Sequence, residues 1–347
     1  MKIIFSFEQL YNFSVELMVR EGLKHEQGEV IAENLLEAEL RGVVTHGLVR
    51  LPVYMERARE GGINKFADVK VIADNGATMI LDGNNTFGQI VGKLAMGHAI
   101  EKAQKYGISF IGVRNSNHFG IAAYYSSMAI EHSMIGFSCS NASPRIAPSG
   151  GASKQLGNNP ISLAFPVLDS FPIVIDMALS VAAAGKIRIA AANNEKIPLG
   201  WAIDKVGRPT EDAISALEGF LLPIGGHKGY ALAFAVDLLC GMLTGSAFGK
   251  EVGKIDELSQ PQRQGHVFGA IRIENFMSMD LYKDKVACYI DNIKGSKKAD
   301  GSNAIYLPGE LEWLAKQRNL EHGLALPVEL VKKLNAIGEH YGLKLPI

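Results

Sequence analysis

Strand-like and helix-like patterns alternate through the middle of this chain of 347 residues. Residues 67–74 and 77–83 alternate apolar and polar side chains between turn residues, which predicts two short strands. Residues 89–107 have helical spacing, and residues 108–116 form a strand-like apolar run. Further strands are expected at 134–141, 161–167 and 172–178, and helices at 119–132, 180–191 and 226–243. This interleaving predicts an α/β or mixed α+β fold.

Both ends of the chain carry helical patterns. Apolar residues recur three and four positions apart within residues 5–19 and again within residues 27–40. A third helix is expected over residues 51–62, where Pro52 occupies the first turn and a glycine pair supplies the stop. The tail from Pro308 predicts two more helices, so helical segments should flank the sheet.

The composition excludes several classes of protein. Apolar residues make up 47% and charged residues 20% of the chain, which fits a folded protein and not a disordered one. Thirty-five basic and 36 acidic residues form no basic run that would bind nucleic acid. The three cysteines are odd in number and widely spaced, which favours a reducing compartment and a cytoplasmic protein. Residues 229–249 are apolar enough to suggest a membrane span, but Asp237 in their middle favours a buried helix.

Motifs of the common nucleotide-binding and hydrolytic enzymes are missing from the sequence. Although the chain has 37 glycines, no GxG occurs, so the GxGxxG loop of the common dinucleotide-binding fold is absent. The phosphate-binding GxxxxGK[ST] loop, the GxSxG nucleophile elbow and the HExxH zinc motif are absent as well. The sequence therefore gives little support for a hydrolase that uses one of these motifs.

The segment THGLVRLPVY (45–54) is the first candidate site. Arg50 and Tyr54 lie four positions apart on one face of the expected helix, and His46 lies at or just before its start. A guanidinium matches a carboxylate, and an imidazole exchanges a proton near neutral pH, so this group resembles a site for a small carboxylic acid. A solvated helix with a capping histidine is the alternative interpretation.

Two further candidates follow expected strands. His118 in VRNSNHFG (113–120) lies between a strand and a helix, where it could take the proton of a substrate hydroxyl; a histidine that serves a turn is the alternative. The stretch 139–160 lacks periodicity, which predicts a long loop that is either functional or flexible. Its donors suit phosphate or carboxylate, and they are Asn141, Ser143, Arg145, Lys154, Asn158 and Asn159.

In two more segments, a strand or loop leads into a helix of small residues. IDMALSVAAAGKI (175–187) and LLPIGGHKGYALA (221–233) would let a ligand approach the backbone closely, with helix N–H groups facing an anion. Lys228 could add a point charge for a pyrophosphate. Tight packing of a helix on a sheet is the alternative explanation for both segments.

Several motifs occur together in a recognisable order. They are THGLVR, SNHFG, SNASP with PSGG and GNNP, IDM, GKI, IPLGWAID, GRPTED, LLPIGGHKGYALA and LPGE. From about residue 30 to residue 325 the chain resembles the type-2 malate/L-lactate dehydrogenases, which look unlike the better-known malate and lactate enzymes in sequence and fold. That family includes ureidoglycolate dehydrogenase, sulfolactate dehydrogenase and 2,3-diketogulonate reductase.

The resemblance implies hydride transfer between NAD(P) and C2 of a 2-hydroxy acid on a non-Rossmann α/β fold, which would account for the missing GxGxxG. It implies a helical, catalytic unit made of residues 1–120 and 310–347, and an NAD(P)-binding unit with a mixed sheet made of residues 121–309. Members of the family are homodimers, so a homodimer is expected. NAD is the expected cofactor, with NADP possible, and no metal is expected.

Matched position by position, His118 and His46 both correspond to residues given an acid/base role, and Arg50 corresponds to the residue that holds the substrate carboxylate. We also expect substrate contacts from Thr45 and Tyr54. Lys154 and Asn158 are expected contacts because they belong to the long loop, and not because of the match. The positions that match dinucleotide contacts are Asp176, Met177, Ala178, Ser180, His227, Lys228, Gly309 and Glu310. Ser143 of the long loop is a further expected cofactor contact. Leu179 stands where the family commonly has a small hydroxyl residue, so one cofactor hydrogen bond is in question at this position.

The leading hypothesis is the oxidation of (S)-malate or the reverse reduction of oxaloacetate. Lactate, sulfolactate and ureidoglycolate are alternative substrates within the family. Two alternatives belong to other classes: a noncatalytic protein that binds a nucleotide or carboxylate, and a metal protein that uses His46, His118 and a carboxylate. Nothing in the residue spacing favours a metal.

Overall fold

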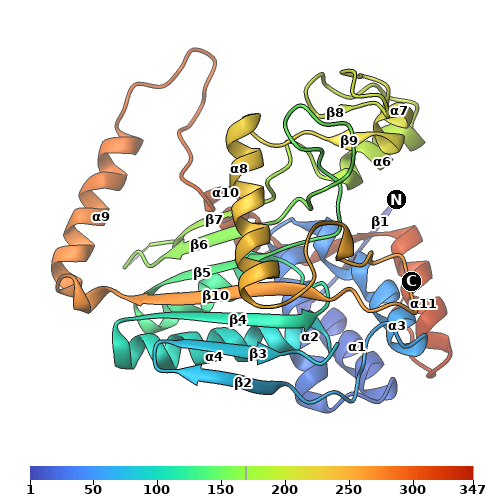
Figure 1. Cartoon of the computed structure of the whole chain (residues 1–347), viewed down its shortest axis with the longest axis horizontal. Helices are drawn as coiled ribbons and strands as arrows, with labels where there is room; N and C mark the ends of the chain where they lie inside the picture. Colours follow the sequence, from blue (N-terminus) through green and yellow to red (C-terminus); the bar gives the residue numbers. More distant parts are fainter. Residues whose placement is uncertain (169, 347) are drawn as a thin grey trace.

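The computed structural model describes residues 1–168 and 170–346 of the chain. Its central feature is a seven-stranded sheet with the strand order β2-β3-β4-β10-β5-β6-β7 (Figure 1). In chain order the strands are β2 (Lys70–Asn75), β3 (Thr78–Asp82), β4 (Ile108–Ser116), β5 (Met134–Ser140), β6 (Ile161–Phe165), β7 (Ile173–Met177) and β10 (Gln264–Arg272). The predicted α/β class is confirmed, as are the strands expected before residue 178.

The strand, helix, strand order expected between residues 77 and 116 is present. β3 and β4 are parallel neighbours, and α4 (Gly88–Tyr106) joins them. α4 ends at Gly107, whose φ of 85° is a left-handed conformation that glycine adopts readily. Every other pair of neighbouring strands in the described sheet is antiparallel, so the sheet is mixed.

The central strand β10 is not among the predicted elements. It lies between β4 and β5, and residues 264–270 are buried. Its first residues are Gln264, Gly265 and His266, which interrupt the apolar run that a strand buried on both faces usually shows. The imidazole fits because its Nδ1 lies 2.7 Å from Ser140 Oγ and its Nε2 lies 2.8 Å from Ser116 Oγ. The partners that permit this polar strand thus come from distant parts of the sequence.

Helices cover both faces of the sheet (Figure 1). α4 and α5 (Ala122–Met128) pack on one face. α8 (His227–Asp237) and the π-helix that continues it (Leu238–Leu243) pack on the other. The helices expected at 119–132 and 226–243 are therefore present. Within the part of the chain that the structure describes, no helix has the length and apolar character needed to cross a membrane.

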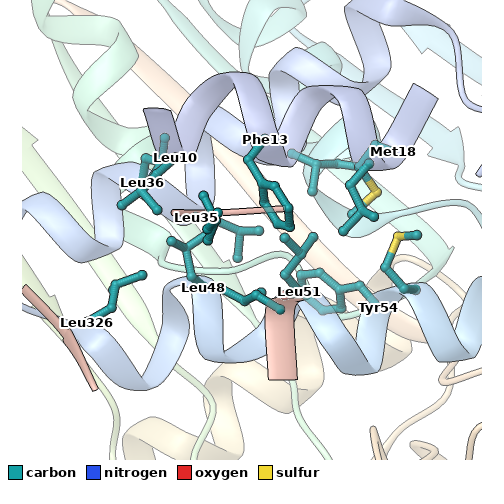
Figure 2. Packing of buried hydrophobic residues seen from close by; sticks show 14 of the residues in the cluster. Leu10, Phe13, Met18, Leu35, Leu36, Leu48, Leu51, Tyr54 and Leu326 are labelled. Atoms are coloured by element: carbon teal, nitrogen blue, oxygen red, sulfur yellow. The ribbon is translucent and has the colours of Figure 1, made fainter. Parts of the chain in front are cut away.

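A second apolar core lies among the helices from the two ends of the chain. It is enclosed by α1 (Phe7–Arg20), α2 (His25–Leu40), α3 (Leu51–Arg59), α11 (Val328–Glu339) and the two-stranded sheet of β1 (Lys2–Phe5) and β11 (Leu324–Pro327). Figure 2 shows side chains of α1, α2 and α3 meeting in this core, among them Leu10, Phe13, Leu35 and Leu51. The helical patterns predicted near both termini are thereby confirmed.

The predicted start of the first helix at Phe5 is wrong. Phe5 belongs to β1, where it pairs with Leu324 of β11. Ser6 begins the helix, because its side chain accepts a hydrogen bond from the Gln9 N–H and the Gln9 side chain bonds the Ser6 backbone. This capping box makes the helix begin only after the strand has ended at Phe5.

A small lobe and α9 lie at the edges of the molecule (Figure 1). The small lobe contains α6 (Ala184–Ala192), β8 (Ala202–Ile203), α7 (Ala213–Glu218) and β9 (Phe220–Leu221). α9 (Met279–Lys294), which was not predicted, stands to the left of the sheet in Figure 1, and the chain returns from it to α10 (Glu310–His322). The large sheet takes strands from both sides of residue 120, and the division into units at that residue remains a prediction.

Candidate active site

A cavity of about 470 Å³ opens where the motifs singled out in the sequence converge. Its walls come from the segment before α3, the loop between β4 and α5, the loop between β5 and β6, the end of β7 and the start of α10. The predicted site residues among its lining are Thr45, His46, His118, Asn158, Asp176, Met177, Ala178 and Gly309. The structure therefore places the THG, NHFG, GNNP and IDM motifs around one space.

The turn that carries His46 is built on a buried carboxyl group. Two short 3-10 helices, η1 (Val44–His46) and η2 (Leu48–Arg50), precede α3 here. Glu39 Oε1 accepts a backbone N–H of η2 at 2.8 Å. A Cβ at Gly47 would lie 2.2 Å from the same oxygen, so only glycine lets the chain pass this close to Glu39.

His46 and His118 stack on each other at the cavity wall. Their ring centroids are 5.4 Å apart and their planes are inclined by 20°. Thr45 Oγ1 lies 3.0 Å from His46 Nδ1, and the Tyr54 hydroxyl lies 2.7 Å from His118 Nδ1. Among the described residues none bonds His118 Nε2, so this nitrogen is the one left for a ligand.

Both histidines are held neutral at pH 7. Burial lowers the pKa of His46 to about 4, and the positive charge of Arg50 acts in the same direction. Burial also lowers the pKa of His118 well below its ordinary value, as do the charges of His46, Arg50 and Arg145. A neutral imidazole has a lone pair on one nitrogen, so either ring can accept a proton from a substrate.

Positive charge gathers beside the two rings. Arg50 donates its Nε–H to the Thr45 carbonyl at 2.8 Å, which fixes the start of its side chain next to η1. Arg145 from the β5–β6 loop lies close enough for its charge to affect His118, and burial together with Arg188 and Arg50 lowers the pKa of Arg145. Guanidinium groups at this place favour a ligand that carries more than one negative charge.

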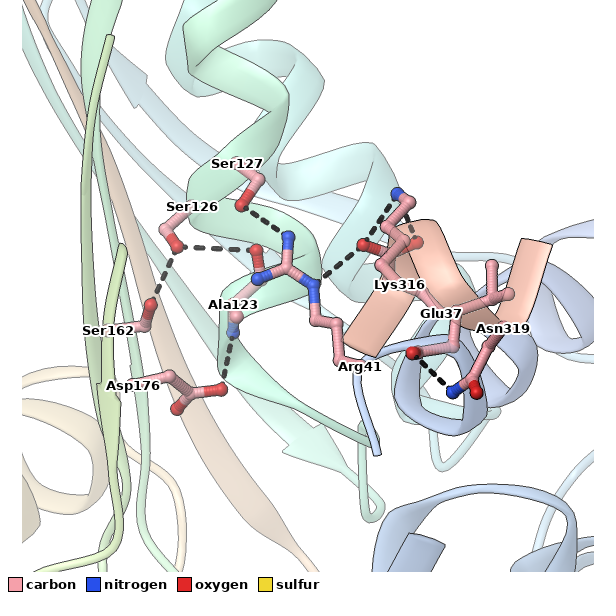
Figure 3. Close-up of polar contacts among 10 residues, drawn as sticks. Glu37, Arg41, Ala123, Ser126, Ser127, Ser162, Asp176, Lys316 and Asn319 are labelled. Atoms are coloured by element: carbon pink, nitrogen blue, oxygen red, sulfur yellow. Dashed lines mark hydrogen bonds and ion pairs between the residues drawn. The ribbon is translucent and has the colours of Figure 1, made fainter. Parts of the chain in front are cut away.

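The far side of the cavity is lined by small residues and by the carboxyl group of Asp176. Asp176 Oδ2 accepts the Ala123 N–H at 3.0 Å, and burial raises the pKa of Asp176 to about 6 (Figure 3). Arg41 lies nearby and bridges two helices: its Nε donates to Glu37 at 2.7 Å and its Nη2 to Ser127 at 3.4 Å (Figure 3). Glycine and alanine residues between these groups let a ligand approach the backbone closely.

The other predicted site residues do not line the cavity. Tyr54 is buried behind His118, and Arg50 lies beside the wall. Lys154, His227 and Lys228 are exposed, the last two in the first turn of α8. The remaining three residues are buried or bonded within the protein. Ser143 is buried, the Ser180 Oγ donates to the Ala182 carbonyl, and Glu310 forms an ion pair with Lys294. Roles for these residues stay predictions.

Several lining residues gave no signal in the sequence. Arg41 precedes the THG motif and Glu312 follows the LPGE motif, but neither belongs to a motif with a chemical meaning. Gln264 could not be found because β10 was not predicted. Arg145 was named among the donors of the long loop, yet only the fold places its charge near His118. The described residues contain no group of three or more metal-ligand side chains that could hold a metal ion.

The chain is similar in sequence and in structure to known proteins. The family model described as malate/L-lactate dehydrogenase matches residues 5–335. The chain belongs to that family. A malate dehydrogenase of Pyrococcus abyssi is 39% identical over 345 residues, which cover 97% of this chain and 94% of the relative.

Two further relatives carry different names. An NAD(+)-dependent ureidoglycolate dehydrogenase of Escherichia coli O157:H7 is 32% identical over 330 residues, covering 95% of this chain and 94% of the relative. The structure of a sulfolactate dehydrogenase from Methanocaldococcus jannaschii superposes with a TM-score of 0.94 at 37% identity, covering 99% of this chain and 98% of that one. This member of the malate/L-lactate dehydrogenase family is accordingly a dehydrogenase of 2-hydroxy acids, and its fold is the family fold.

Proposed function

We propose that this family member oxidises (S)-malate to oxaloacetate with NAD, and catalyses the reverse reduction. The observation that carries the proposal is the stack of two neutral histidines at the cavity wall, with Arg50 and Arg145 close enough for their charges to lower the pKa of His118. Malate has two carboxylates, and two guanidinium groups can pair with both. Lactate has one carboxylate and would leave one guanidinium without a partner.

Substrate binding is assigned to the side of the cavity near η1. Arg50 pairs with the C1 carboxylate of malate through its planar fork, and Arg145 attracts the C4 carboxylate. Thr45 and Asn158 line the same region and supply a hydroxyl and an amide for the remaining oxygen atoms. Held in this way, the C2 hydroxyl lies toward the two histidines.

The proton of the C2 hydroxyl goes to a histidine. We assign this role to His118, because its ring lines the cavity and its Nε2 has no partner among the described residues, while Tyr54 holds its Nδ1. For Nε2 to take the proton, the neutral ring must carry its own hydrogen on Nδ1. The Tyr54 oxygen, 2.7 Å away, accepts that hydrogen in this tautomer, whereas the other tautomer would let Nδ1 accept the Gly120 N–H at 3.3 Å. His46, stacked on the same ring, is the alternative acid/base and otherwise keeps His118 neutral through its position.

The residues on the far side of the cavity fit a dinucleotide. A bound NAD would supply the acceptor for the hydride that leaves C2 of malate. Asp176 keeps a carboxyl oxygen free of the Ala123 hydrogen bond, and Met177, Ala178 and Gly309 present backbone and small side chains to the same space. Backbone groups can therefore hold phosphates and riboses here without the GxGxxG turn. NADP remains the alternative cofactor.

We further propose a cytoplasmic homodimer, as the family resemblance implies. α9 supports a second subunit because it has no buried residue and exposes Leu281 and Tyr289 on its surface. A second copy that covers this helix would remove those side chains from water.

A substrate panel tests the proposed activity. Purified protein is mixed with (S)-malate, lactate, sulfolactate or ureidoglycolate and either NAD or NADP, and reduction is followed by absorbance at 340 nm. The highest kcat/KM is expected for malate with NAD, because specificity is a ratio of these values. A higher kcat/KM with another acid would replace malate as the substrate, and cofactor binding without turnover of any acid would favour the noncatalytic alternative.

A further inference from the structure

Arg57 is the largest side chain in the described structure that is completely buried. It forms no ion pair with a described carboxylate, although the negative charges of Glu257 and Asp256 raise its pKa against the effect of burial. It lies on α3, three residues after Tyr54. Its two terminal nitrogens donate to backbone carbonyls at distances from 2.6 to 3.4 Å, and those carbonyls belong to Gly62, Lys254, Ile255, Glu257 and Gln260. A buried guanidinium is costly unless its donors are satisfied, so this arrangement calls for an explanation.

One of the same nitrogens bonds the residue that precedes His118 of the candidate active site. Arg57 Nη2 donates to Asn117 Oδ1 at 3.1 Å, and Asn117 directly precedes His118. The Asn117 amide is fixed on its other side, where Nδ2 donates to the Asn85 and Thr86 carbonyls at 3.0 and 2.9 Å. The residue before the proposed acid/base is therefore tied to α3 through a single guanidinium.

Arg57 also acts on His118 through the loop of residues 254–262. The carbonyls bound by Arg57 fix this loop, and the loop places Gln262, whose Oε1 accepts the His118 N–H at 3.0 Å. The loop also passes so near the end of α3 that a Cβ at Gly62 would lie 2.0 Å from the Leu258 carbonyl oxygen. The residue before His118 and the N–H of His118 itself thus both depend on the same cation.

We infer that Arg57 is a positioning residue. Its guanidinium joins α3, the segment of Asn117 and the loop of residues 254–262, and thereby holds His118 against Tyr54 at the cavity. This inference rests on the proposed role of His118 and adds the device that holds it. Tyr54 and Arg57 share one helix, so the group that bonds the imidazole and the group that fixes its backbone move as one body. The carbonyl cage itself resembles a cation site and should accept a free guanidinium ion when the side chain is removed.

The test compares Arg57→Ala, Arg57→Lys and the wild-type protein. NMR titration of the His118 ring is the first measurement, since it does not require turnover. Without Arg57 the ring should lose its fixed, buried position, and its pKa should rise toward the ordinary histidine value. Guanidinium chloride, added far below denaturing concentrations, should restore the wild-type titration of Arg57→Ala. Lysine keeps the charge but cannot reach all carbonyls at once, so Arg57→Lys should recover only part of the effect.

Turnover is the second measurement, made with the acid of the panel that the wild type oxidises fastest. We expect kcat of Arg57→Ala to fall by about 10²-fold, the usual cost of misplacing a reacting group by about 1 Å, with little change in KM because Arg50 is untouched. Guanidinium should recover kcat. Leu334→Ala, which removes a completely buried side chain of α11, is the matched control and should lower the melting temperature while keeping kcat.

Gln262→Met keeps Arg57 but removes the acceptor of the His118 N–H. This variant therefore tests whether the loop of residues 254–262 connects Arg57 to His118. If Arg57 acts through this loop, the double variant with Arg57→Ala should lose little more than Arg57→Ala alone. Unchanged His118 titration and kcat in folded Arg57→Ala or Arg57→Lys, or losses that guanidinium does not reverse, would overturn the inference. Absence of turnover in the wild type would instead contradict the proposed function, while the NMR titration would still decide the role of Arg57.

Discussion

The rings of His46 and His118 stack at 5.4 Å although they come from two motifs more than seventy residues apart in the chain. Each ring lowers the tendency of its neighbour to hold a proton, because protonation of one places a positive charge against the other. The pair therefore contains one site for a proton rather than two. That arrangement suits a reaction in which a single proton leaves a substrate hydroxyl.

Replacement of each histidine should separate their roles. His118→Ala is expected to lower kcat for malate oxidation by roughly 10²–10⁴-fold, the usual contribution of a general base. His46→Ala should lower kcat less, since it removes a neighbour and not the proton acceptor. The rates are measured at 340 nm, with the exposed His25→Ala as control. A larger loss in His46→Ala than in His118→Ala would transfer the acid/base role to His46.

Tyr54→Phe tests the hydrogen bond behind His118. The aromatic ring is completely buried and contacts Phe87 edge-on, so phenylalanine should keep the packing and the melting temperature. Loss of the hydroxyl should lower kcat about tenfold, which corresponds to one hydrogen bond of about 1.4 kcal/mol, while KM stays near the wild-type value. Tyr11→Phe, which removes a hydroxyl bonded to Glu29 on the surface, serves as control. An increase in KM with unchanged kcat would instead indicate a substrate contact.

Arg145→Met tests the choice between one and two carboxylates. Methionine keeps much of the volume but removes the charge, so kcat/KM for malate should fall tenfold to about a hundredfold, as for a lost hydrogen bond to a charged group. The value for lactate should hardly change, because lactate has no second carboxylate. The exposed Arg208→Met is the control. Equal losses for both acids would show that Arg145 does not select the dicarboxylate.

Glu39→Gln should alter how stability depends on pH. Burial raises the pKa of Glu39 from 4.5 in a free chain to about 7 in the folded protein. Between these values the unfolded chain releases the proton while the folded one keeps it, so the free energy of unfolding falls as the pH rises from 4.5 to 7. Glutamine removes this titration and can still accept the Leu48 N–H.

The two proteins should therefore be equally stable near pH 4, and the variant should be more stable by about 3 kcal/mol at pH 8. Urea unfolding at a series of pH values measures the difference. Glu101→Gln, at a largely exposed position of α4, should behave like the wild type at every pH. A constant difference between Glu39→Gln and the wild type across this range would contradict the raised pKa.

Short-range patterns predicted most elements before residue 178, because a strand, a helix and their turns are specified by neighbouring residues. β3 and β4 with the helix between them, and the two helical patterns near the N-terminus, are examples. β10 escaped detection because its burial depends on partners more than a hundred residues away: His266 is tolerated only through Ser116 and Ser140. Polar residues in a central strand give no local signal of that kind.

The residues of the candidate site likewise fall into two groups: those that the sequence predicted and those that only the fold revealed. Motif order identified the family, and the THG and NHFG histidines were found because their residue types carry the chemistry. Tyr54 was expected to contact substrate, yet in the fold it lies behind His118, since the face of α3 that bears it turns toward the core. The exposed position of Lys154 and the buried role of Arg57 likewise follow from packing and not from composition.

By itself, the sequence determined the family, the alternation of strands and helices, and the chemical groups available for catalysis, because these depend on residue type and local spacing. Only the tertiary structure decided which of those groups meet, which nitrogen of His118 is left for a ligand, and how strongly burial shifts its pKa. The physical reason is that hydrogen bonding and desolvation are set by neighbours in space, and these neighbours come from segments that the chain brings together only on folding.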